Sequence, residues 1–135
     1  MTIFHRASAG LVVSGAFALG LLYAPPPTYA DSASDTVKLQ NDNTGKCLTI
    51  AGGVSTENNV RALQYNCDSD PSRRWTLHKM TDGTYMIKNV QTHKCLTIAG
   101  GVSTENNVDA LQYNCDNRRS RTWRLIWRTT NFDDN

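Results

Sequence analysis

Hydrophobic and polar residues alternate in short runs after about residue 37. In the first half of the chain the alternating runs are residues 37–39, 48–50, 63–65 and 75–77. A period of two is typical of half-buried strands. Turn-forming residues such as Gly52-Gly53 and Asp82-Gly83 separate the runs. The pattern predicts a small all-β fold and indicates no helix after residue 30.

The same pattern occurs twice, because residues 46–67 and 94–115 are almost identical. These 22-residue segments differ only where Arg61 in the first stands against Asp109 in the second. A fixed offset of 48 residues indicates one supersecondary unit used twice, neither copy burying its apolar face alone. We expect repeat 1 over about residues 37–84 and repeat 2 over about residues 85–128, with four strands in each.

The first thirty residues have a different composition. Basic His5 and Arg6 precede an uncharged apolar run over residues 9–24, then three prolines and a small-residue exit at Ala30. This order is typical of a secretory signal peptide, whereas a membrane anchor usually needs a longer apolar span. We expect residues 1–30 to be removed, and residues 31–135 to be a secreted domain that does not insert into a membrane.

Four cysteines, all after residue 30, suit an oxidising space. Four cysteines allow three pairings, and the repeat favours one bridge in each copy, Cys47–Cys67 and Cys95–Cys115. Each such bridge contributes about 3 kcal/mol in the chain-entropy model.

A strand register follows if each cysteine faces its partner across an antiparallel pair. Thr49 then lies opposite Tyr65, on the disulfide side of the sheet. Gln64 points to the other side with Leu48, where a buried amide needs hydrogen-bond partners.

Charge is nearly balanced after residue 30, with 13 Lys plus Arg against 12 Asp plus Glu and a formal charge of +1. This balance argues against a dedicated nucleic-acid partner. Five arginines lie close together near the end of the chain: Arg118, Arg119, Arg121, Arg124 and Arg128. We interpret them as a solvated edge balanced by Asp109, Asp116, Asp133 and Asp134, and an anion site is the alternative.

No catalytic or metal-binding pattern is recognisable. His78 and His93 occupy non-equivalent positions in the two copies, and with the cysteines bridged neither a zinc set nor a Ser–His–Asp arrangement remains. We therefore expect a binding protein, not an enzyme, with no metal and no cofactor.

One composite motif occurs in both copies. Gly-Lys-Cys-Leu-x-Ile, x-Leu-Gln-Tyr-x-Cys and x-x-Trp occur at residues 45–50, 62–67 and 72–75, and again, with His93 replacing the glycine, at 94–98, 110–115 and 120–123. This combination resembles the ricin B-type lectin repeat. The resemblance implies a β-trefoil of four-stranded units and carbohydrate binding, often as a targeting module beside an enzyme. A trefoil has three repeats, so the two recognised here predict an incomplete one.

The resemblance also implies the position of the sugar sites. The candidate carbohydrate-binding residues are Thr49, Tyr65, Asn66 and Arg73 in repeat 1, and Thr97, Tyr113, Asn114 and Arg121 in repeat 2. The galactose-binding copies of the family carry Asp at the two threonine positions and Asn-Gln at the two Ser-Arg positions. Threonine accepts sugar hydroxyls only weakly, and arginine suits an acidic group. We expect up to two equivalent glycan or polysaccharide sites with tyrosine platforms; the alternative is a protein-interaction module that has lost sugar binding.

The missing third repeat predicts an open apolar side. Its expected walls are Leu48, Ile50, Trp75, Leu96, Ile98 and Trp123. Large exposed apolar patches rarely persist on soluble monomers. We therefore expect a homo-oligomer, or a protein partner that completes the trefoil.

Overall fold

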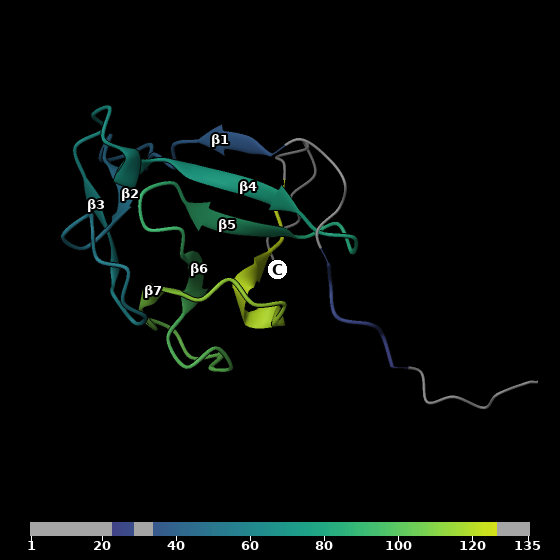
Figure 1. Ribbon diagram of the computed structural model, residues 1–135. Coiled ribbons are helices and arrows are strands. Elements are labelled where there is room, and N and C mark those ends of the chain that lie inside the picture. The colour runs from purple at the N-terminus through teal and green to yellow at the C-terminus, as the bar shows by residue number, and fades with distance from the viewer. Residues whose placement is uncertain (1–22, 29–33, 127–135) are drawn as a thin grey trace, which may run out of the picture.

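A computed structural model describes residues 23–28 and 34–126 (Figure 1). The strands are β1 (Asp35–Val37), β2 (Cys47–Ile50), β3 (Ala62–Tyr65), β4 (Trp75–Lys79), β5 (Tyr85–Asn89), β6 (Cys95–Ile98), β7 (Ala110–Tyr113) and β8 (Thr122–Trp123). The predicted all-β fold is confirmed. Two unpredicted single-turn 3-10 helices, η1 (Pro71–Arg73) and η2 (Arg119–Arg121), precede β4 and β8.

Most of the predicted signal peptide lies outside the described residues. Within the part of the chain that the structure describes, no helix has the length and apolar character needed to cross a membrane.

The strands form two antiparallel sheets. The larger has the order β1-β4-β5-β6-β7 with β8 paired to β5, and the smaller contains β2 and β3. The long β4–β5 ladder joins the repeats, because β4 belongs to repeat 1 and β5 to repeat 2, with Trp75 opposite Asn89. The two repeats therefore share a sheet and form one body.

Both expected disulfides, Cys47–Cys67 and Cys95–Cys115, are formed. The expected strand register was wrong by two residues. Tyr65 lies opposite Cys47, not opposite Thr49. The physical reason is that Cys67 lies beyond the end of β3 and reaches Cys47 from outside the ladder, with their Cα atoms 5.0 Å apart.

The predicted faces of this hairpin are unaffected by the register error. A shift of two residues keeps every side chain on its own face, so Thr49 and Tyr65 still share one face. Gln64 lies opposite Leu48 on the other face. The hydrogen-bond partners of this glutamine differ from those of its equivalent, Gln112, in repeat 2.

The core lies where the apolar faces of the two sheets meet. Ile50, Trp75, Ile87 and Leu96 are buried there. Of the six positions expected to line an open side, three are buried and three are half-buried, so the expectation was wrong except at Leu48, which lines a hollow beside Gln64. Two repeats are enough to cover these side chains because the shared sheet brings both copies' apolar faces together.

The repeats contact each other through a loop. Residues 54–60 of repeat 1 lie along β7 of repeat 2, where Asn59 N donates to Gln112 O and Gln112 N donates to Val60 O, both at 2.9 Å. The Gln112 side chain is fully buried beneath this loop. Its Nε2 donates to Ser55 O at 2.8 Å and Glu57 O at 2.7 Å, and its Oε1 accepts from Thr92 Oγ1 at 2.8 Å. Every polar atom of this buried amide is therefore bonded.

Gln64, the equivalent residue in repeat 1, is exposed. It keeps the threonine bond, from Thr44 Oγ1 at 2.9 Å, but no loop of the described residues 23–28 and 34–126 covers it. A hollow of about 370 Å³ lies beside it, lined by Leu39, Gln40, Asn41, Lys46, Leu48 and Gln64. We call β3 and this hollow the open face. It lies at one end of the molecule, where β2 and β3 form the outer edge (Figure 1).

Candidate functional site

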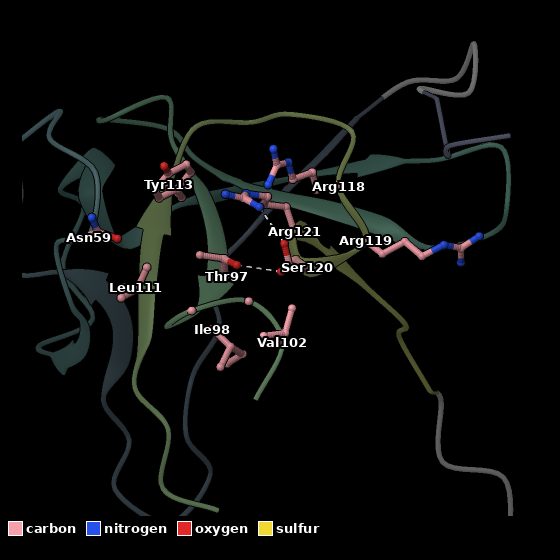
Figure 2. A pocket seen from close by; sticks show the side chains of 12 residues that line it. Asn59, Thr97, Ile98, Val102, Leu111, Tyr113, Arg118, Arg119, Ser120 and Arg121 are labelled. Carbon is pink, nitrogen blue, oxygen red and sulfur yellow. Dashed lines mark hydrogen bonds between the residues drawn. The ribbon is translucent and has the colours of Figure 1, made fainter. Parts of the chain in front are cut away.

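A pocket lies at the same place in each repeat, between the disulfide-bridged hairpin, a Gly-Gly turn and the following 3-10 helix. The repeat-1 pocket is lined by Thr49, Ile50, Gly52, Gly53, Leu63, Tyr65 and Arg73. The repeat-2 pocket is lined by the equivalent residues Thr97, Ile98, Gly100, Gly101, Leu111, Tyr113 and Arg121, with Val102, Arg118, Arg119, Ser120 and the cross-repeat Asn59 (Figure 2).

The two pockets differ in size. The repeat-2 pocket holds about 500 Å³, and the repeat-1 pocket about 260 Å³. Asn59 contributes to this difference, because the loop of repeat 1 adds a wall to the repeat-2 pocket. The matching wall of the repeat-1 pocket would have to come from a unit on the open face.

The Gly-Gly turn brings the backbone close to the 3-10 helix. Gly100 and Gly101 have φ values of 71° and 73°, which L side chains rarely adopt. A Cβ on Gly101 would lie 3.0 Å from the Cβ of Ser120. Glycine is thus required here to shape the pocket floor.

The two threonines hold the pocket together from inside. Thr97 Oγ1 donates to Ser120 O at 2.7 Å, and Thr49 Oγ1 donates to Ser72 O at 3.0 Å. Both threonines are buried. Their hydroxyl hydrogens are used within the protein, so these residues position the 3-10 helices.

Each pocket contains a stacked tyrosine and arginine. The guanidinium carbon of Arg73 lies 4.6 Å from the ring centre of Tyr65, and that of Arg121 lies 4.4 Å from the ring centre of Tyr113. Both arginine side chains are nearly buried. Cation–π contact fixes ring and guanidinium against each other. The tyrosine and the arginine both line the pocket, so a ligand there would contact both.

The acidic neighbours of the two arginines differ. Arg73 lies between two carboxylates, Asp68 at 3.4 Å from Nε and Asp70 at 3.1 Å from Nη1. Hydrogen bonds from Ser72, and then the positive charge of Arg73, lower the pKa of Asp70, so its carboxylate is ionised at neutral pH.

In repeat 2 the acidic partner is Asp116, whose Oδ1 lies 3.3 Å from Arg121 Nε. The position equivalent to Asp70 is occupied by Arg118.

The structure thus brings three of the four predicted residues together in each repeat. Asn66 and Asn114 are the exceptions: they lie outside both pocket linings and accept hydrogen bonds from Lys46 Nζ and Lys94 Nζ. Sequence reasoning predicted the Gly-Gly turn and noted Arg118 in the arginine cluster, but it placed neither of them in the pocket, and it missed Asn59. The signal for Arg118 was present, because the near-identity of the copies ends just before this loop.

The fold and its paired pockets define a trefoil-type domain in which successive repeats carry matching surface sites. The family model for ricin-type β-trefoil lectin domain-like proteins matches residues 28–113 and, in a second overlapping segment, 78–134. The chain belongs to this family. Among curated proteins, none has a significantly similar sequence.

Solved structures show the same fold. A designed threefold-symmetric protein, ThreeFoil, matches with a TM-score of 0.64 and 24% identity over 74% of this chain and 70% of that chain. An exo-β-1,3-galactanase from Clostridium thermocellum matches at 0.65 and 24% identity over 78% of this chain but 22% of its own. The Haemophilus ducreyi cytolethal distending toxin matches at 0.56 and 19% identity, over 73% and 57%. A 70% share of a threefold body is close to two of its three units.

Proposed function

We propose that this chain is a secreted carbohydrate-binding protein without catalytic activity of its own. The observation that carries the proposal is the stacked Tyr–Arg pair lining a pocket at the same position in each repeat. An aromatic ring offers an apolar face for sugar C–H groups, and the guanidinium offers donors for hydroxyl or acidic oxygens. Membership of the lectin-like family and the two disulfides support binding outside the cell.

The two sites are unequal in this proposal. The repeat-2 pocket is the principal site because it is larger and Asn59 adds a wall from the other repeat. Weak sites on one body gain strength by binding the same polysaccharide together. The repeat-1 pocket therefore adds avidity rather than a second strong site.

Removing the aromatic rings tests the sugar proposal. We expect Tyr113→Ala to weaken glycan binding by up to about tenfold, because aromatic contacts contribute about 0.5–1.5 kcal/mol. Tyr65→Ala should weaken it less, and the double variant should abolish it. A glycan array would select the ligand and calorimetry would measure each affinity. Tyr113→Phe keeps the ring and is the matched control. Unchanged binding in the double variant, or cleavage of the glycan, would contradict the proposal.

A second function is favoured by the contrast between Gln112 and Gln64. We propose that the open face binds repeat 2 of another copy of this chain, in an exchange in which that copy's repeats separate at the β4–β5 ladder. The loop over residues 54–60 that covers Gln112 has the same sequence as residues 102–108, and β3 has the same sequence as β7. The interface inside the chain is therefore a template for one between chains.

Charge supports the same pairing. Within the chain, Arg61 at the end of the loop of repeat 1 lies 3.0 Å from Asp109 before β7. In the contact between chains, the incoming loop is residues 102–108 of one chain, and Asp109 follows it directly. The receiving strand is β3 of the other chain, and Arg61 precedes it directly. Opposite charges thus meet in both arrangements, and the single difference between the 22-residue copies is the one that makes the contact complementary.

Sedimentation of the disulfide-intact protein at tens of micromolar tests this assembly. We expect association, and we expect Gln64→Arg to return the protein to monomers because a charge would be buried where an amide fits. Gln91→Arg adds the same charge to an exposed glutamine that belongs neither to the open face nor to residues 102–108, and should leave association unchanged. A folded monomer for the unaltered protein would overturn the assembly without touching the sugar proposal.

A further inference from the structure

We infer that the repeat-2 pocket binds an anionic sugar, one that carries carboxylate or sulfate groups, whereas the repeat-1 pocket binds a neutral one. This inference rests on the proposed carbohydrate function and specifies the ligand class of each site. The two pockets are built on separate hairpins whose strands have identical sequences. Their charges differ in the loop that follows each hairpin.

The loops that close the two pockets carry different charges. Residues 68–75 contain two aspartates and two arginines and are neutral. Residues 116–123 contain one aspartate and three arginines, a formal charge of +2. The change comes from Asp70 and Pro71, which stand where repeat 2 has Arg118 and Arg119, and from Arg74, which stands where it has Thr122. The hairpin residues facing the pocket are the same in both copies.

In repeat 1 the loop neutralises its own arginine. Asp70 accepts hydrogen bonds from Ser72 N at 2.8 Å and Ser72 Oγ at 2.6 Å, and so caps η1. The same carboxylate lies 3.1 Å from Arg73, and Asp68 approaches that arginine from the Nε side. The two carboxylates balance the arginines of this loop, so the loop carries no net positive charge.

In repeat 2 the corresponding loop points arginines at the pocket. Arg118 replaces the capping carboxylate, and η2 has no side-chain cap. Figure 2 shows Arg118 and Arg121 close together beside Tyr113, while Arg119 extends away from them. Two guanidinium groups therefore face one cavity.

Asp116 does not neutralise this pair. It lies 3.3 Å from Arg121 Nε and 3.8 Å from Arg118 Nε, so one carboxylate is shared by two arginines. The Arg118 side chain is 78% exposed, and exposed ion pairs contribute little. Its planar fork of donors remains available to bind an oxyanion through two parallel hydrogen bonds.

The structure describes two of the four aspartates that were expected to balance the arginine cluster. Asp109 was expected to balance them, but it pairs with Arg61 across the repeat interface. Asp133 and Asp134 lie outside the described residues. Of the aspartates expected to balance the cluster, Asp116 is the one found at ion-pair distance from it within the described ranges 23–28 and 34–126.

Matched sugars and a loop exchange test the inference. The probes are a uronic-acid oligosaccharide with its methyl ester, and a sulfated galactan oligosaccharide with its desulfated form. We expect each acidic probe to bind at least about tenfold more tightly than its neutral form, as charged hydrogen bonds allow, with affinity falling as salt rises. Comparing the uronate and sulfate pairs shows which acidic group the site prefers.

The loop exchange uses the sequences already in the chain. Arg118→Asp with Arg119→Pro gives repeat 2 the charges of repeat 1 at these positions, and should remove the acidic preference while neutral binding is kept. Asp70→Arg with Pro71→Arg should create an acidic preference at repeat 1. Arg118→Lys keeps the charge and controls for the loss of arginine. Urea midpoints would show that every variant is folded.

The outcomes separate the two proposals. Equal affinity for acidic and neutral probes, or an acidic preference that survives Arg118→Asp with Arg119→Pro, overturns this inference and leaves the carbohydrate function standing. Failure of the unaltered protein to bind any glycan overturns the carbohydrate function and the inference with it.

Discussion

Replacing Trp75 by alanine should lower the free energy of unfolding by about 3–5 kcal/mol, the usual loss for a large aromatic residue in a core. Trp75 is completely buried among Ile50, Ile87 and Leu96. Its Nε1 also donates to Leu48 O at 3.0 Å. The substitution therefore leaves a cavity and a carbonyl without its partner.

The second repeat supplies the matched control for this change. Trp123 makes the equivalent bond, to Leu96 O at 3.0 Å, but it is only half-buried. Trp123→Ala should therefore cost clearly less than Trp75→Ala. Urea unfolding with the disulfides intact measures both. Equal losses would mean that the two tryptophans are equally buried, which contradicts this description of the core.

Gln112→Ala should lower the free energy of unfolding by about 2–3 kcal/mol, because it leaves buried polar groups without partners. The lost amide serves Ser55 O, Glu57 O and Thr92 Oγ1 at once. Its removal should also loosen the loop of repeat 1 from β7. Faster amide exchange at Asn59, whose N–H donates to Gln112 O, would report that loosening.

Gln64→Ala is the control, since Gln64 has the same neighbours in sequence but an exposed side chain. Exposed substitutions usually change stability by less than about 0.5 kcal/mol. When both proteins are measured as monomers, the urea midpoint of Gln64→Ala should be nearly that of the unaltered protein. A loss as large as that of Gln112→Ala would show that Gln64 is also covered within one chain.

Local patterns predicted the strands and their faces well. The alternation around Thr49 and around Tyr65 placed both on one side of a sheet, and the structure keeps them there. The register was missed because the bridge was assumed to join facing ladder positions, whereas Cys67 lies outside its strand. A covalent link fixes a distance, and several registers are compatible with one distance.

The difference between the repeats could not be predicted from their near-identical sequences. Gln64 and Gln112 have the same local preferences, and only a neighbouring repeat decides which of them is buried. The walls expected to be open were misjudged for the same reason, because the sharing of β4 and β5 between repeats is a tertiary feature. For the site, the resemblance identified Thr49, Tyr65 and Arg73 as neighbours, while Asn59 reaches its pocket from the other repeat.

The open face has a consequence for the number of chains in an assembly. A threefold ring has three sectors, and one chain fills two of them. If a second chain docked with its two repeats still joined, one repeat would fill the vacant sector and the other would overlap a sector that the first chain already fills. The vacant sector therefore accepts a single repeat. Rings built from this chain alone therefore close only when some chain separates its repeats at the β4–β5 ladder. Three chains, with six repeats, fill two rings completely. Assemblies of two or four chains leave at least one repeat outside a closed ring.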